Sequence, residues 1–437
     1  MSNSQQKSNK KPKRKKKKQR FNILHSAFTH SMYSIFKFPL IGFSMLFYNI
    51  RYKRNGYKIP KGPVLFLSNH SSNPDGLWVM GLALSKTIFF VVNEELFANK
   101  FFRIFTSGVA QFIKRSTSLN DVGHIRELRR YVKQGRSVGI FPAGDIGMFG
   151  ESLPVDESIA KLAKMLDVPI VTTKITGAAL RAQRTIKKMR RSKITYHITD
   201  VISVEDVRSL TNESLHERIV QGIEHNEPEW QKEQMIKLKT KRKLAEHYEL
   251  GLFLCPKCGH YETLKSNNND INCLNCDFKV TVNRYDQLDY YEVNPTYPTF
   301  INANDWDKWQ LEKLKEKIDN WDDHNTPIAY RENLYYNEVK KDEIFQPYSE
   351  KNAKACSFAI FLDKIVLTSD KGEIIHELYF ENSDIYRILV QYKDVYELDF
   401  GEYRLRVFSK QKDFPAHMYI EASRHLLHKN NVIISTR

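Results

Sequence analysis

Apolar segments and amphipathic segments alternate from Gly62 to Val201, and this alternation constrains the fold more than any other feature. Short apolar runs of strand length are separated by segments with the 3.6-residue spacing of a helix. The expected strands are Val64–Asn69, Thr87–Asn93, Ser137–Phe141, Val168–Thr176 and Ser192–Thr199, and the expected helices are Asp121–Gln134 and Ser158–Leu166. This order predicts an α/β fold with a mostly parallel sheet, whose functional residues gather at the carboxyl ends of its strands.

A polar stretch, FLSNHSSNPDG (Phe66–Gly76), ends the first of these strands. Turn formation alone explains its Asn, Pro, Asp and Gly residues. In a catalytic interpretation, Asn73 caps a helix that begins at Pro74, so that Asp75 enters the first turn and His70 folds back onto it. A carboxylate on one ring nitrogen of histidine fixes the tautomer and makes the other nitrogen a better base. The spacing by itself leaves both interpretations open.

Four blocks in order resemble the 1-acylglycerol-3-phosphate (lysophosphatidic acid) acyltransferase family. They are NHSSNPD at 69–75, QFIKR at 111–115, FPAG at 141–144 and VPIV at 168–171, all within residues 61–224. They are similar to the family's NHxSxxD block, its block ending in arginine, its FPEG block and its VPIVP strand. The resemblance implies a glycerolipid-acyltransferase-like domain that transfers an acyl chain to a lipid hydroxyl.

The resemblance also assigns roles to residues. It implies that His70 is the catalytic base and that Asp75 orients it. It implies that Arg115 binds the phosphate of the acceptor, a task suited to a planar guanidinium, and that Lys114 assists.

The third block departs from the family pattern. Gly144 and Asp145 belong to this acceptor-binding block, but Ala143 stands where the family has glutamate, and Asp145-Ile146 stand where it has Thr-Arg. Asp145 is a candidate to replace part of the lost acidic function. The default acceptor is 1-acylglycerol-3-phosphate, although these departures leave its headgroup open.

The N-terminus is strongly basic. The chain has 437 residues and a formal net charge of +17, and Lys7–Arg20 alone holds ten lysines and arginines. Residues 1–20 are therefore expected to form a disordered tail that either stays solvated or binds anionic lipid. Nucleic acid is the competing partner of such a tail and is the less favoured one.

Residues 21–60 are predicted to associate with a membrane. The uncharged run Phe38–Ile50 is shorter than the roughly 20 residues that a spanning helix needs. Its aromatic and aliphatic residues are flanked by basic ones, which is typical of a segment lying in the membrane interface. A buried core helix is the alternative. The expected location is the cytoplasmic face of the cell membrane, peripheral or monotopic.

Four cysteines, Cys255, Cys258, Cys273 and Cys276, form the pattern CPKC-x14-CLNC. Two CxxC knuckles supply the four thiolates that a structural Zn²⁺ site requires, so residues 251–282 are predicted to be a zinc ribbon. With four cysteine ligands, no coordination position remains for a reactive water. His260 is a less favoured substitute ligand. A disulfide framework is not expected in the absence of an export signal.

The remaining segments complete the predicted organisation. An acyltransferase domain at 61–227 is followed by a charged linker helix at 228–250, and an α+β domain occupies 283–437. Its short alternating strands between two helices, Asp305–Trp321 and Ala416–His428, predict a mainly antiparallel sheet, loosely like a pleckstrin-homology barrel. Cys356 in this domain is expected to be a buried, inert thiol.

Three functions are consistent with these features. The favoured one is a membrane-associated O-acyltransferase of phospholipid biosynthesis, whose acyl donor is a thioester of acyl-carrier protein or CoA, or an acyl phosphate. The second is a catalytically inactive lipid-binding or scaffold protein with the same fold. The third, a nucleic-acid-binding protein, does not explain the ordered blocks or the Phe38–Ile50 segment.

Overall fold

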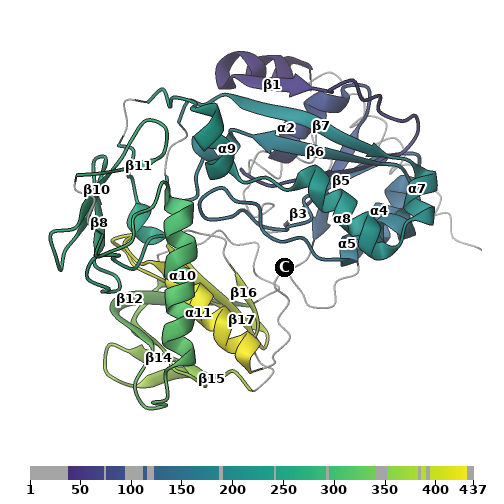
Figure 1. Ribbon diagram of the computed structural model, residues 1–437. Helices are drawn as coiled ribbons and strands as arrows, with labels where there is room; N and C mark the ends of the chain where they lie inside the picture. Colours follow the sequence, from purple (N-terminus) through teal and green to yellow (C-terminus); the bar gives the residue numbers. More distant parts are fainter. Residues whose placement is uncertain are drawn as a thin grey trace, which may run out of the picture.

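The computed structural model describes residues 38–72, 75–93, 112–115, 123–186, 190–240, 243–291, 295–340, 352–381, 385–389 and 394–430. The predicted basic tail and the first part of the predicted membrane segment, residues 1–37, lie outside this range. Figure 1 shows an α/β unit, a small β unit around β8–β11, and a C-terminal β unit crossed by two helices.

The α/β unit is built on a seven-stranded sheet with the order β1-β7-β6-β2-β5-β3-β4. Its strands are β1 (Ile50–Lys53), β2 (Leu65–Ser68), β3 (Ile88–Asn93), β4 (Phe112–Arg115), β5 (Ser137–Ile140), β6 (Ile170–Thr176) and β7 (Ile194–Ile202). Neighbouring strands are parallel except β6 and β7. The predicted mostly parallel sheet is confirmed. The strand β1 also places the end of the predicted membrane segment inside the sheet.

Helices cover both faces of this sheet (Figure 1). One face packs against α4 (Gly123–Lys133), α5 (Ser158–Leu166), α7 (Val204–Ser209) and α8 (Asn212–Ile223). The other face packs against α2 (Asp75–Val79) and the 3-10 helix η1 (Met80–Ala83). The alternation of side chains along each strand supplies both cores, so that Leu65 and Leu67 face one helical layer and Phe66 faces the other.

The predicted linker helix over 228–250 is wrong in extent. The helix α9 covers only Glu227–Gln234, and the described residues after it, 235–240 and 243–247, form no helix ahead of a short 3-10 helix, η3 (Tyr248–Leu250). The density of charge in this segment is typical of an exposed helix. Several of its apolar residues are instead buried against the cysteine unit, with Leu238 and Tyr248 at most 1% exposed.

The cysteine unit is a four-stranded antiparallel sheet with the order β11-β10-β9-β8. Its strands are β8 (Leu264–Asn267), β9 (Asp270–Cys273), β10 (Lys279–Val282) and β11 (Leu288–Tyr290). The predicted ribbon ends at residue 282, but the sheet continues to Tyr290 because β11 pairs with β10. We call this unit, from Gly251 to Tyr290, the cysteine ribbon.

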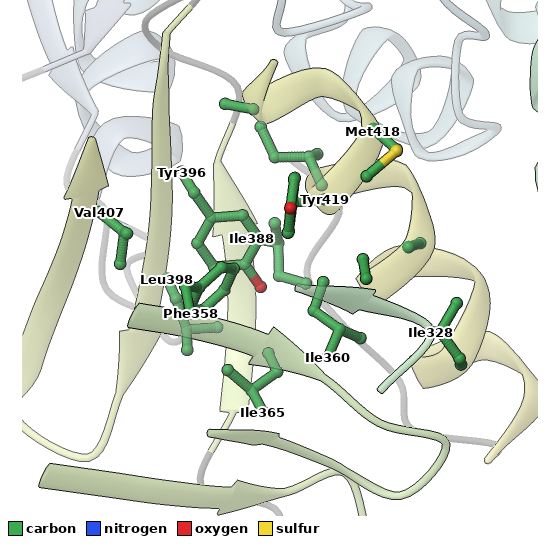
Figure 2. Close-up of a cluster of buried hydrophobic side chains, with 14 of the residues drawn as sticks. Ile328, Phe358, Ile360, Ile365, Ile388, Tyr396, Leu398, Val407, Met418 and Tyr419 are labelled. Atoms are coloured by element: carbon green, nitrogen blue, oxygen red, sulfur yellow. The ribbon is translucent and has the colours of Figure 1, made fainter. Parts of the chain in front are cut away.

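The C-terminal unit is a seven-stranded antiparallel sheet with the order β15-β14-β13-β12-β18-β17-β16. Its strands are β12 (Ala329–Lys340), β13 (Lys354–Ile360), β14 (Lys364–Ser369), β15 (Ile374–Tyr379), β16 (Ile385–Leu389), β17 (Val395–Phe400) and β18 (Tyr403–Phe408). Figure 2 shows its core, where Met418 and Tyr419 of α11 (Ala416–Lys429) meet strand residues such as Phe358 and Tyr396. The predicted antiparallel sheet with a closing helix is confirmed, and the pleckstrin-homology likeness stays a prediction. Burial raises the pKa of the Cys356 thiol to about 12, as expected of an unreactive cysteine.

The helix α10 (Ala303–Asp319) joins the three units. Its Trp306 is fully buried in the core of the cysteine ribbon and donates to the carbonyl of Leu254 at 3.0 Å. Its Asn304 and Lys308 bind the Glu151 carboxylate of the α/β unit at 2.8 and 2.9 Å. Its C-terminal half packs in the core of the C-terminal unit.

Residues 38–48 form a helix ahead of β1. Ile41 and Ser44 of this helix are buried, whereas Phe38, Leu46 and Phe47 are 56%, 76% and 55% exposed. Among the described residues, no helix combines the length and the apolar character that crossing a membrane requires.

Candidate active site

The two polar loops that follow β2 and β5 meet at one edge of the sheet. The strands are parallel neighbours, with Leu67 opposite Ile140. Both strands therefore lead into their loops at the carboxyl edge of the sheet. There the His70 ring stacks on the Phe141 ring, with centroids 4.4 Å apart and an angle of 17° between the planes. The sequence places both loops correctly at this edge.

His70 and Asp75 are in contact. The His70 Nδ1 atom lies 3.1 Å from the Asp75 Oδ2 atom, and Asp75 is the first residue of α2. The predicted folding back of His70 thus describes the observed geometry. Asn73 and Pro74, the predicted cap and first helical residue, lie outside the described residues.

Hydrogen bonds to both oxygens hold the Asp75 carboxylate in place. The backbone amides of Ser71 and Ser72 donate to Oδ2 at 2.7 Å each, and the Ser72 hydroxyl donates to Oδ1 at 2.5 Å. The hydroxyl of Tyr196, on β7, donates to Oδ1 at 3.1 Å. Asp75 is fully buried, and these donors replace the water that an ionised carboxylate loses on burial.

Tyr196 has no signal in the sequence that marks it as part of the site, because it lies 121 residues from Asp75. Burial, and then the charge of Asp75, raise the pKa of its phenol well above the usual value. The group therefore stays a donor. Asn69 is a second supporting residue: its side chain donates to the Ile175 carbonyl at 2.9 Å and accepts from the Ile175 amide at 2.7 Å. These two hydrogen bonds connect the end of β2 to β6.

This arrangement suits general base catalysis. With Nδ1 turned toward Asp75, the Nε2 atom of His70 is the nitrogen that can accept a proton from a hydroxyl. The His70 side chain is 18% exposed, whereas Asp75 is fully enclosed. The ring is thus reachable from outside, and the carboxylate that orients it is shielded.

The predicted acceptor residues lie further along the same edge. Arg115 ends β4, opposite Asn93 of β3. Gly144 adopts a φ of +72°, and a Cβ atom built on it would lie 3.8 Å from the Arg115 Nη1 atom. The structure therefore brings Arg115 and Gly144 together. Lys114 is also in β4, opposite Val92.

Asp145 is held by a residue that the sequence does not point to. The Asp145 Oδ1 atom accepts from the Ile146 amide at 2.8 Å and lies 3.2 Å from Nη2 of Arg184. The Nη1 atom of Arg184 donates to the Ile146 carbonyl at 2.5 Å. The Asp145 carboxylate is therefore occupied by an ion pair, and Arg184 provides a guanidinium beside the third block.

The four predicted metal ligands converge in the cysteine ribbon. The Sγ atoms of Cys255 and Cys276 are 3.8 Å apart, those of Cys258 and Cys273 are 3.7 Å apart, and all four lie within 4.8 Å of one another. Sulfurs bound tetrahedrally to zinc at about 2.3 Å are about 3.8 Å apart, so the cluster fits this metal. The Nδ1 atom of His260 instead lies 3.1 Å from both the Cys258 carbonyl and the Asn275 amide nitrogen.

Comparisons with known proteins find sequence similarity to acyltransferases. Residues 49–176 match the acyltransferase family model. A 1-acyl-sn-glycerol-3-phosphate acyltransferase of Limnanthes douglasii is 26% identical over 166 residues, which is 38% of this chain and 59% of that protein. One of Cocos nucifera is 27% identical over 32% of this chain and 46% of that protein. The chain thus spans about half the length of these relatives.

Among solved structures, the chain is similar to the 1-acyl-sn-glycerophosphate (LPA) acyltransferase PlsC from Thermotoga maritima. The identity is 18% and the TM-score is 0.33, over 45% of this chain and 79% of that one.

Proposed function

We propose that this chain, whose residues 49–176 form a domain of the acyltransferase family, is a glycerolipid O-acyltransferase that works at a membrane surface. It transfers an acyl chain from an acyl thioester or acyl phosphate to the hydroxyl of a lysophospholipid, with 1-acylglycerol-3-phosphate as the default acceptor. The observation that carries the proposal is the buried, fully hydrogen-bonded Asp75 carboxylate 3.1 Å from the reachable His70 ring.

The proposed reaction begins when His70 Nε2 takes the proton of the acceptor hydroxyl as its oxygen attacks the acyl carbon. Asp75 stabilises the imidazolium that results. The tetrahedral intermediate then collapses, and the bond from the acyl carbon to the thiolate or phosphate breaks. The imidazolium returns its proton to the leaving group, so that the enzyme ends unchanged. General base catalysis of this kind typically contributes about 10²–10⁴-fold to a rate.

Arg115 is assigned to the phosphate of the acceptor. Its guanidinium lies at the carboxyl edge that also carries His70, and it approaches Gly144, where the absence of a side chain leaves room. A bidentate guanidinium–phosphate contact would fix the acceptor in one orientation. Lys114 is the neighbouring candidate for the same anion.

The helix at residues 38–48 supports attachment to a membrane. Its exposed face carries Phe38, Leu46 and Phe47, and the exposed basic residues Arg51 and Lys53 follow it. Apolar side chains beside basic ones suit an interfacial helix that also attracts anionic lipid headgroups. The location proposed is the cytoplasmic face of the cell membrane, with peripheral or monotopic attachment.

The cysteine cluster is assigned to a structural Zn²⁺ ion. Cys255, Cys258, Cys273 and Cys276 would hold it, and it would supply folding energy rather than a reactive water, because all four positions are filled by protein.

The proposal is tested by incubating the purified full chain with acyl-CoA, acyl-carrier protein and acyl phosphate donors against a panel of lysophospholipids. Formation of a diacyl product by the wild-type chain, with none from a His70→Ala blank, is the expected result. Binding of lysolipid without turnover by any donor would instead identify a non-catalytic lipid-binding protein.

A further inference from the structure

The loop after β5, residues 141–150, begins in the α/β unit and ends in the core of the cysteine ribbon. Its first half carries Gly144 and Asp145 and lies beside His70 and Arg115. Its second half leaves the sheet and enters the core of the cysteine ribbon. We call residues 141–150 the acceptor loop.

Met148 and Phe149 provide the first connection between the acceptor loop and the ribbon. They are 8% and 2% exposed, and they belong to the same buried cluster as the ligands Cys255 and Cys273. The Phe149 ring centroid lies 5.9 Å from that of Tyr248. The ring also fills the space that Gly251 leaves, since a Cβ atom there would be 2.6 Å from it. The loop is thus anchored inside the ribbon core.

Arg184 provides the second connection. Its guanidinium donates hydrogen bonds to two groups of the loop, the Ile146 carbonyl and the Asp145 carboxylate. Its side chain is only 11% exposed, which favours a single geometry over a mobile surface contact. A lysine in its place could not make both contacts with the same fixed fork.

The ribbon in turn holds the residue next to Arg184. The Asp286 carboxylate, at the turn between β10 and β11, accepts a hydrogen bond from Gln183 Nε2. It also accepts from Arg190 Nη1 and from the Tyr248 hydroxyl, at 2.9 Å each. The constraint therefore runs from Asp286 through Gln183 and Arg184 to the acceptor loop.

We propose that the cysteine ribbon positions the acceptor loop, and that Arg184 is the positioning residue that carries this constraint to Asp145 and Ile146. This inference rests on the proposed function in one respect, namely that the loop binds the acceptor. The third block lacks the glutamate and the Thr-Arg of the family pattern. Contacts from the cysteine ribbon and from Arg184 instead order the loop before the acceptor binds. A pre-ordered loop lowers the entropy lost on binding.

Hydrogen exchange on the full chain tests the coupling without any activity measurement. The reporters are the amides of Gly144 and Ile146, which are hydrogen-bonded at 3.0 and 2.8 Å. Cys258→Ser, which weakens the ribbon, and Arg184→Lys should each raise exchange in residues 142–150 by about ten-fold or more, while β2 and β6 stay protected. The matched control is Arg208→Lys, because Arg208 of α7 makes an exposed bidentate pair with Asp167 and its replacement should change nothing in the loop.

Unchanged exchange of the acceptor loop in Arg184→Lys overturns the proposal. If Cys258→Ser fails to fold, the exchange of the acceptor loop in Arg184→Lys still tests the proposal. With active protein, Arg184→Lys should raise the acceptor KM by about ten-fold and leave kcat near the wild-type value. A fall in kcat at constant KM would contradict a positioning role. If the wild-type chain transfers no acyl group, the proposed function fails, and the exchange data still decide whether the ribbon orders the loop.

Discussion

Asp75 is the residue whose surroundings define the candidate site. A carboxylate with no exposed surface is tolerated because amides and hydroxyls are already directed at both of its oxygens. These donors come from its own loop and from β7, so they are in place before any substrate binds. His70 is therefore oriented by a rigid group, which is what a general base requires.

Removing the Tyr196 hydroxyl tests this support. Tyr196→Phe should lower the free energy of unfolding by about 1.5–3 kcal/mol, because a hydrogen bond to a buried charged group is lost. It should also slow acyl transfer. Tyr330→Phe is the matched control, since the Tyr330 hydroxyl donates to Glu332 at 2.8 Å on the exposed surface. Urea unfolding measures both variants, and equal losses would show that the burial of Asp75 is not the cause.

At the scale of single elements, the helix at residues 38–48 makes the clearest prediction. Leu46→Glu should weaken binding to vesicles containing anionic lipid by about ten-fold or more, because a leucine that enters the membrane interface contributes about 1.5–3 kcal/mol. Leu274→Glu is the matched control, since Leu274 is 75% exposed on the ribbon and Leu46 is 76% exposed on the helix. Co-sedimentation with vesicles measures both. Unchanged binding in Leu46→Glu, or the same loss in both variants, would remove the helix as the membrane contact.

The contact between α10 and α11 makes a prediction about pH. The His417 Nε2 atom lies 3.0 Å from the Asp307 Oδ1 atom in a buried position. Burial alone lowers the pKa of His417, but the charge of Asp307 and its hydrogen bond outweigh it, so that the pKa is raised. The folded state therefore holds this proton more tightly. The stabilisation is complete below the unfolded pKa of about 6.5 and is lost as the pH rises through the raised folded value.

His417→Gln removes this dependence. The difference in free energy of unfolding between the wild type and His417→Gln should be larger at pH 6 than at pH 9. His324→Gln, at an exposed position, is the control for replacing a histidine without removing the buried pair. A difference for His417→Gln that grows with pH would contradict the raised pKa.

Local patterns in the sequence predict individual elements well. Apolar runs and helical spacing locate β2, β3, β5, β6 and α5, because these patterns arise from the faces that each element buries. The prediction for the segment after α9 is wrong because it used only the local density of charge. The burial of Leu238 and Tyr248 depends on contacts with the cysteine ribbon, which lies later in the chain.

The candidate site shows the same difference between residues paired locally and residues brought together only by the fold. His70 and Asp75 are close in sequence, so their pairing follows from the spacing and from a turn. Tyr196 and Arg184 reach the loops only through the order of the strands, and no short motif contains them. The convergence of the cysteines is predictable because each CxxC knuckle is local and supplies two of the four sulfurs.

At the scale of the whole molecule, metal content tests the assignment of the ribbon. The purified chain should carry about one zinc ion, and Cys273→Ser should carry essentially none. Cys356→Ala is the control, because Cys356 is buried in the C-terminal unit and belongs to no cluster of metal-ligating side chains in the described part of the chain. Elemental analysis by plasma emission spectrometry makes the measurement. Zinc retained in Cys273→Ser would contradict a four-cysteine site.

The three units share cores and ion pairs, so the molecule is expected to act as one body around the carboxyl edge of its first sheet. Glu151 binds Asn304 and Lys308 of α10, Met148 and Phe149 pack in the core of the cysteine ribbon, and Arg184 binds the acceptor loop. We propose that the His70–Asp75 pair at this edge carries out the acyl transfer.

The most direct test is the initial rate of acyl transfer by His70→Ala, measured at saturating lysophospholipid against His324→Ala. Near-ultraviolet circular dichroism checks that both variants keep the wild-type fold. The kcat of His70→Ala should fall by about 10²–10⁴-fold, while His324→Ala should keep the wild-type rate. A His70→Ala protein that turns over at the wild-type rate would contradict the proposed role of His70 as the catalytic base.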